Sequence, residues 1–135
     1  MGTRSTVKFY RGGKCLLALY NQYDGYYEGV GQELVDFFGN KENYGNGFED
    51  TALLYVCHKK QGKAYNTYLT SERNIEEYNY IIEDSETGLT FSIFKESLLE
   101  DKNGDAHFVY EYPIRWASFE DFKKFIEDNS IKEVV

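Results

Sequence analysis

The spacing of apolar residues changes along this chain, and the order of those changes limits the folds that it can adopt. Apolar and polar residues alternate over residues 6–10, which is typical of a β-strand. From Val30 onward, apolar residues recur every three or four positions, as on one face of a helix. Alternation returns between residues 77 and 112, and the chain ends on a helical spacing. This order predicts an α+β fold, with about three helices packed on one face of a mostly antiparallel sheet.

The N-terminal segment predicts a β-hairpin. Residues 6–10 form its first strand, and residues 15–20 are an apolar run of strand length. Gly12 and Gly13 lie between the two runs, and a Gly-Gly pair suits a tight hairpin turn. Asp24 and Gly25 are expected to end the second strand.

A first helix is expected from residue 30. Its apolar stripe consists of Val30, Leu34, Phe37 and Phe38. Gly39 is expected to end it in the left-handed conformation that glycine adopts easily.

A second helix is expected to start at an Asn46 N-cap and to end at Gly62. Its apolar stripe consists of Phe48, Ala52, Tyr55 and Val56. Leu53, Tyr55 and Cys57 also alternate, so a strand is the alternative for this segment.

The second half predicts a β-meander and a closing helix. Short strands are expected at residues 67–70, 77–83, 89–93 and 107–112. Asn103-Gly104 is a strong hairpin-turn signal, and Pro113 is expected to close the last strand. The helix spans residues 119–128 behind a Ser118 N-cap, and its apolar stripe consists of Phe119, Phe122, Phe125 and Ile126. The sequence has no linker and no repeat, so residues 1–135 are expected to form one domain.

The formal net charge is −8, and it is unevenly distributed. Residues 1–69 hold 8 basic and 7 acidic side chains, whereas residues 70–135 hold 7 basic and 16 acidic ones. Binding to nucleic-acid phosphates needs a basic face, so direct nucleic-acid binding is not expected. The acidic half is interpreted as a solubilising surface, and the alternatives are a surface for a basic partner and a mimic of DNA.

The sequence lacks the standard catalytic and metal-binding patterns. Cys15 and Cys57 belong to no Cys-x-x-Cys pair and are expected to be buried free thiols, and a single disulfide between them is the alternative. Gly29-Val30-Gly31 begins like a dinucleotide-binding turn, but Leu34 occupies the third glycine position. No metal and no cofactor are therefore expected. The chain has neither an apolar run of membrane-spanning length nor a hydrophobic signal region, so a cytoplasmic location is expected.

The most unusual segment, residues 20–31, joins a strand to a helix. It contains four tyrosines, three glycines and two carboxylates. Antiparallel pairing through the Gly12-Gly13 turn would bring Arg4 close to residues 20–22. A helix start presents backbone N–H groups, and small residues let a ligand approach them. The predicted ligand-binding residues are Arg4, Tyr20, Gln22, Asp24, Tyr26, Gly29 and Gly31. The alternative is that Arg4 and Asp24 form a structural clamp and that the glycines serve only the turn.

The chain resembles a family of small, mostly uncharacterised phage and bacterial proteins. The resemblance rests on Met1-Gly2-Thr3-Arg4-Ser5, on the Gln22-Tyr23-Asp24-Gly25-Tyr26 segment, and on Gly29 and Gly31 before a helix. The chain departs from the family pattern at Tyr27, where proline is expected, and at Val30, where histidine is expected. The resemblance implies a phage or prokaryotic cytoplasmic setting and no particular reaction.

These observations favour a non-enzymatic binding module, such as a phage-associated accessory or counter-defence protein. It would bind a protein partner, or a small anionic ligand at the helix start near Gly29 and Gly31. The alternative is a small hydrolase or transferase acting on a nucleotide-like substrate. In that case Asp24 or Glu28 would be the acid/base group, and Arg4 would stabilise charge. The oligomeric state is left open.

Overall fold

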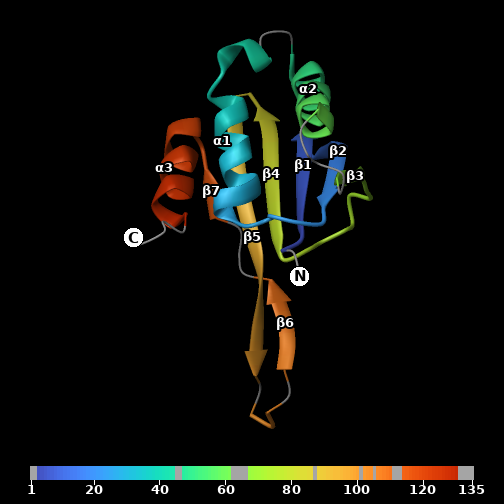
Figure 1. Ribbon diagram of the computed structural model, residues 1–135, viewed down its shortest axis with the longest axis vertical. Helices are drawn as coiled ribbons and strands as arrows, with labels where there is room; N and C mark the ends of the chain where they lie inside the picture. Colours follow the sequence, from blue (N-terminus) through green and yellow to red (C-terminus); the bar gives the residue numbers. More distant parts are fainter. Residues whose placement is uncertain are drawn as a thin grey trace.

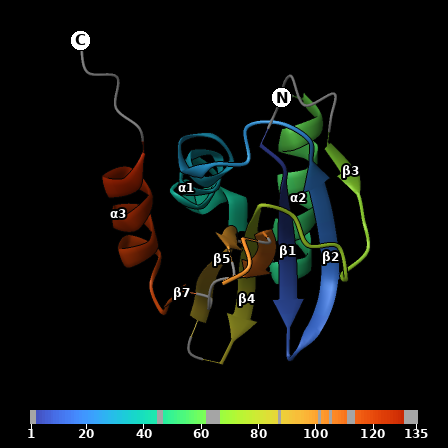
Figure 2. The ribbon, with the colours of Figure 1, turned by 90° about the horizontal axis from the view of Figure 1, so that it is seen from below.

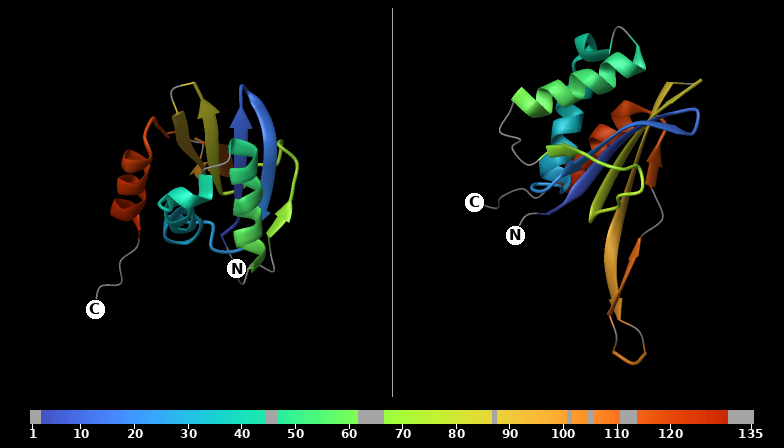
Figure 3. Two further views of the ribbon diagram at one scale, coloured as in Figure 1. Left: turned by 90° about the horizontal axis from the view of Figure 1, so that it is seen from above. Right: turned by 90° about the vertical axis from the view of Figure 1, so that its right-hand side faces the viewer.

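A computed structural model describes residues 3–44, 47–61, 67–86, 88–100, 102–104, 106–110 and 114–130. It confirms the predicted α+β fold: one mixed, mostly antiparallel sheet carries its helices on one face (Figures 1 and 3). The predicted roles of Asn46, Gly62 and Pro113 fall outside the described residues.

The sheet has the strand order β3-β2-β1-β4-β5-β6, and β7 also pairs with β5. Its strands are β1 (Ser5–Arg11), β2 (Lys14–Asn21), β3 (Thr67–Leu69), β4 (Tyr78–Ser85), β5 (Gly88–Glu100), β6 (Ala106–Tyr110) and β7 (Ile114–Trp116). The predicted hairpin is β1–β2, and Gly12 and Gly13 in its turn both have positive φ. β1 and β4 are parallel neighbours, because the intervening chain crosses from one edge strand back to the centre of the sheet (Figure 2).

In the described residues, three α-helices and two short helical turns lie between and after the strands. They are α1 (Gln32–Phe38), α2 (Phe48–Gln61) and α3 (Phe119–Asn129), with a π-helical turn η1 (Tyr27–Gly31) and a 3₁₀ turn η2 (Lys41–Tyr44). Residues 48–61 are therefore helical and the strand alternative is wrong. The Ser118 hydroxyl accepts a hydrogen bond from the Asp121 N–H, which confirms the predicted N-cap of α3.

The prediction that α1 ends on a left-handed Gly39 is wrong. Gly39 has a φ of −71°, in the right-handed region. Its N–H donates to the carbonyl of Val35 at 2.8 Å, so the helical bonding pattern continues through this residue. The chain then enters η2 instead of turning away.

The core lies between the sheet and the helices. Val7 and Phe9 of β1 are fully buried, and the Phe9 ring lies 5.6 Å from the Tyr55 ring of α2. The stripe predicted for the first helix, Val30, Leu34, Phe37 and Phe38, is buried throughout. From α3, Phe122 and Ile126 are buried, and the Phe122 ring stacks on Phe91 at 4.7 Å.

The strand β5 is longer than predicted and extends past β4. The last residue pair between the two strands is Tyr78 with Lys95, whereas residues 96–100 pair with β6. Figure 1 shows this part of the hairpin projecting from the sheet. The turn that joins β5 to β6 contains Gly104, which has positive φ, at the predicted Asn-Gly position.

Both cysteines are free thiols, but the expectation that they are buried is wrong. Cys15 is half-buried on β2, and Cys57 is exposed because it lies on the side of α2 away from the sheet. Among the helices described, none has the length and apolar character needed to cross a membrane.

Candidate functional site

The predicted site residues gather at the end of the sheet where β1 begins and β2 ends. Ser5 pairs with Asn21 in the hairpin, so Arg4 and Gln22 follow directly beyond that pair. The Gly25 N–H donates to the carbonyl of Thr3 at 2.9 Å, which holds the loop after β2 against the first described residues. The predicted proximity of Arg4 to the end of β2 is thus confirmed.

The backbone of this loop has two uncommon features. Asp24 has a φ of 60°, and among the described residues it is the one non-glycine residue with positive φ. Two residues after Gly25, the chain enters the π-helical turn η1. Left-handed non-glycine residues and π turns both occur often at functional sites.

The N–H groups at the start of the helical segment are used within the chain. Val30 donates to the carbonyl of Asp24 at 2.8 Å, and Gly29 donates to the carbonyl of Tyr26 at 3.0 Å. Gly31 also donates to the Tyr26 carbonyl, at 3.4 Å. These donors close the turn on itself, so they are not directed at an external anion.

The three glycines allow close packing. A Cβ on Gly29 would lie 2.0 Å from the Asp24 carbonyl oxygen, and one on Gly25 would lie 2.6 Å from the Ser5 Cβ. A Cβ on Gly31 would lie 2.8 Å from the Ile126 Cδ1 of α3. The space beside each glycine is therefore filled by the protein's own atoms.

Aromatic contacts fix the loop to the core. The Tyr80 hydroxyl of β4 donates to the Gly25 carbonyl at 2.8 Å, and burial raises the pKa of this hydroxyl well above its usual value. The Tyr27 ring meets Tyr78 and Phe125 edge-on, each at 5.2 Å. The loop backbone is thereby held from both the sheet and α3.

Several side chains of the loop remain on the surface. Arg4 and Asp24 are exposed, and Tyr23 is 47% exposed. Asp24 Oδ1 accepts a 2.8 Å hydrogen bond from the Tyr26 hydroxyl, which raises the pKa of Tyr26. Within the described part of the chain, the Arg4 side chain forms no hydrogen bond or ion pair, so the Arg4–Asp24 clamp is not formed there.

Tyr20 lies apart from this group. Its ring is half-buried on the face of the sheet opposite the helices and stacks on Tyr68 of β3 at 6.4 Å. The loop therefore brings together Arg4, Gln22, Asp24 and Tyr26, and it adds Tyr23, which sequence reasoning did not single out. We call these five residues the Arg4 corner.

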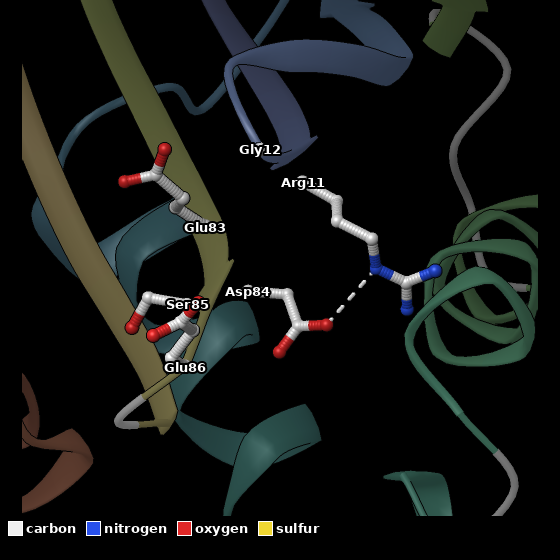
Figure 4. A pocket seen from close by; sticks show the side chains of 6 residues that line it. All are labelled: Arg11, Gly12, Glu83, Asp84, Ser85 and Glu86. Atoms are coloured by element: carbon white, nitrogen blue, oxygen red, sulfur yellow. Dashed lines mark hydrogen bonds and ion pairs between the residues drawn. The ribbon is translucent and has the colours of Figure 1, made fainter.

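A hollow of about 440 Å³ lies at the other end of β1, away from the Arg4 corner. It is lined by Arg11, Gly12, Glu83, Asp84, Ser85 and Glu86 (Figure 4). Arg11 Nε donates to Asp84 Oδ2 at 3.1 Å, and the same guanidinium pairs with Glu49 of α2. Because Arg11 is already paired and three carboxylates line the wall, this hollow is poorly suited to a small anion.

Sequence reasoning also missed a polar cluster on the face of the sheet opposite the helices. Lys8, on β1, is only 3% exposed, and its amine donates to the Asn74 carbonyl at 2.6 Å. Tyr10, Cys15 and Glu72 lie close enough to influence one another's charge. The one signal in the sequence is a lysine between the apolar residues Val7 and Phe9 at the centre of the first strand.

No family model, no curated protein and no solved structure matches this chain.

Proposed function

We propose that this protein is a non-enzymatic binding module that engages a protein partner through the Arg4 corner. The observation that carries the proposal is a contrast within one loop. Its backbone is fixed by hydrogen bonds from Gly25, Val30 and Tyr80, whereas Arg4, Tyr23 and Asp24 remain exposed.

This contrast favours binding for an energetic reason. A rigid loop loses little conformational entropy when a partner docks, so more of the contact energy contributes to affinity. Tyrosine and arginine are also the residue types that most often dominate protein–protein binding energy. The corner offers both of them beside a carboxylate, so it can form apolar, cationic and hydrogen-bonding contacts together.

The anionic-ligand version of the prediction receives less support. The backbone N–H groups of Gly29, Val30 and Gly31 donate within the loop, and no glycine leaves room beside it. Arg4 would be the remaining anion contact, and one exposed arginine does not enclose a small ligand. Binding to the surface of a protein partner, by contrast, does not require an enclosed pocket.

The hydrolase or transferase alternative is likewise not favoured by a specific observation. Its acid/base candidate, Asp24, is hydrogen-bonded to the Tyr26 hydroxyl. Among the described residues, no hydrogen bond joins either group to a histidine or a cysteine. The resemblance of residues 1–40 to phage and bacterial proteins supports a partner inside a prokaryotic cell, in keeping with an accessory or counter-defence role.

Site-specific photo-crosslinking tests the proposal. A benzophenone amino acid replaces Tyr23 in the protein expressed in a bacterial host, and a control replaces Leu53, which is 60% exposed on α2. We expect a discrete crosslinked protein band from position 23, and we expect Arg4→Ala to reduce it strongly. Equal band patterns from positions 23 and 53, or a band that Arg4→Ala leaves unchanged, would contradict the assignment.

A further inference from the structure

The connection between β3 and β4 crosses the face of the sheet that carries no helices. Val7 and Phe9 point into the core, so Thr6, Lys8 and Tyr10 of the same strand point to the opposite face. The Lys8 amine meets the Asn74 carbonyl there, in the middle of residues 70–77. Figure 2 shows this yellow-green segment passing across β2 and β1 to reach β4. We call residues 70–77 the strap.

The two ends of the strap are firmly attached. At one end, the Thr70 N–H donates to the Ala18 carbonyl at 3.0 Å. At the other end, the Glu76 N–H donates to the Asn79 side chain at 2.9 Å, and the Asn79 amide donates back to the Glu76 carbonyl at 2.8 Å. Asn79 is fully buried and also accepts from the Thr6 hydroxyl, so this end belongs to the sheet.

The middle of the strap is attached differently. One hydrogen bond from β1 reaches it within the described chain, from the Lys8 amine to the Asn74 carbonyl. Ile75, its one large apolar residue, is 41% exposed, so it is not a fully buried anchor. A segment without buried apolar anchors has low local stability, even where the surrounding sheet is stable.

The strap also covers a group that prefers water. Lys8 is only 3% exposed, and burial is the main cause that lowers its pKa, so the covered site disfavours the ammonium. Uncovering Lys8 would return its charge to solvent, which offsets part of the cost of breaking its contact with Asn74.

We infer that residues 71–75 open as a unit, without unfolding of the sheet, and that opening exposes the Lys8 amine. This conformational device does not depend on the proposed partner site.

Hydrogen exchange of the unmodified protein gives the first test. The Asn74 N–H donates to the Ser71 carbonyl inside residues 71–75, so its exchange reports opening of this segment, whereas the Glu76 N–H, bonded to the anchored Asn79, is the internal control. Local opening exposes little surface, so exchange of the Asn74 amide should be nearly independent of low denaturant concentrations, whereas the Glu76 amide and the β1 and β4 amides should respond with the slope of global unfolding. If the Asn74 amide follows the global slope, the inference is overturned.

Two lysine variants give the second test. Lys8→Met removes the hydrogen bond to the Asn74 carbonyl and should accelerate exchange of the Asn74 amide about fivefold, since a net hydrogen bond is worth about that factor. Lys14→Met, at an exposed position of β2, is the matched control and should leave the exchange unchanged. Equal rates in the two variants would exclude the Lys8–Asn74 contact as a restraint and overturn the inference.

Discussion

The Tyr80 hydroxyl donates a 2.8 Å hydrogen bond to the carbonyl oxygen of Gly25, 55 residues earlier in the chain. The bond joins the centre of the sheet to the loop that carries the Arg4 corner. A second buried tyrosine, Tyr55 of α2, differs from it: within the described chain, its hydroxyl has no hydrogen-bond partner. The two hydroxyls are alike in chemistry and burial, so they form a matched pair for measurement.

Replacing Tyr80 by Phe should destabilise the protein by about 1–2 kcal/mol, because the buried Gly25 carbonyl would lose its donor. Replacing Tyr55 by Phe should instead be neutral or stabilising by up to about 1 kcal/mol, because it removes a buried hydroxyl without a partner. Urea unfolding of the two variants measures both free energies. Equal destabilisation by the two changes would show that the hydroxyl of Tyr55 is satisfied in solution.

Alkaline pH should destabilise the protein through its buried tyrosines. Burial raises the pKa of Tyr55 and Tyr80 well above the usual value of 10.0, so the folded protein keeps these protons where the unfolded chain loses them. Their contribution to the free energy of unfolding is therefore complete below about pH 10 and is lost as the pH rises through the folded-state pKa.

Lys8 acts in the opposite direction, because its pKa is lowered and its contribution grows as the pH rises toward 10.5. The tyrosine effect is therefore best measured as a difference between wild type and Tyr55→Phe. Urea unfolding between about pH 9 and pH 11 should show a shallower loss of stability in the variant. Parallel pH profiles for the two proteins would exclude Tyr55 as a contributor.

Gly29→Ala should cost several kcal/mol or prevent folding. Its Cβ would lie 2.0 Å from the Asp24 carbonyl oxygen, which is a backbone atom that already accepts from Val30. Gly31→Ala is the matched comparison, since its Cβ would lie 2.8 Å from the end of the Ile126 side chain, which can move. We expect the second change to cost about 1–3 kcal/mol, as for modest overpacking. Thermal unfolding that ranks the two changes in the reverse order would contradict this account of the loop.

Ser118→Ala should destabilise the protein by about 1 kcal/mol, because the first turn of α3 loses its cap. The hydroxyl accepts from the Asp121 N–H at 3.2 Å. Ser118→Asp supplies another acceptor and should keep most of the stability, although Glu120 and Asp121 already place negative charge in this turn. A loss of the same size in both variants would point to a role of Ser118 other than capping.

Local patterns predicted the elements of this fold well. The alternation over residues 6–10 and the Gly12-Gly13 pair predicted β1–β2, and the recurrence of Phe37 and Phe38 with Val30 predicted the buried face of α1. These signals act between residues close in sequence, so one chain suffices to detect them. The prediction of a left-handed Gly39 was wrong. The helical hydrogen bonds continue past this residue into η2, and no local pattern in the sequence indicated that continuation.

The chemistry of the candidate site was predicted less completely. The predicted pairing of the hairpin strands placed Arg4 at the end of β2, and the structure confirms that placement. The sequence could not show that the N–H groups of Gly29 and Val30 are used within the loop, since this depends on the π turn and on the left-handed Asp24. Nor could it show that Lys8 lies beneath the strap, since Asn74 is 66 residues away in sequence.

By itself, then, the sequence determined the order and type of α1 to α3 and of β1 to β6, and it placed Arg4 near the end of β2, because hydrophobic period and turn chemistry are local properties. It did not indicate β7, η1 or η2. Tertiary structure alone decided that β1 pairs with β4, that Tyr80 reaches Gly25, and that Arg4 remains exposed near Asp24. Each of these depends on contacts between distant segments, whose free energy is set by how the whole chain packs.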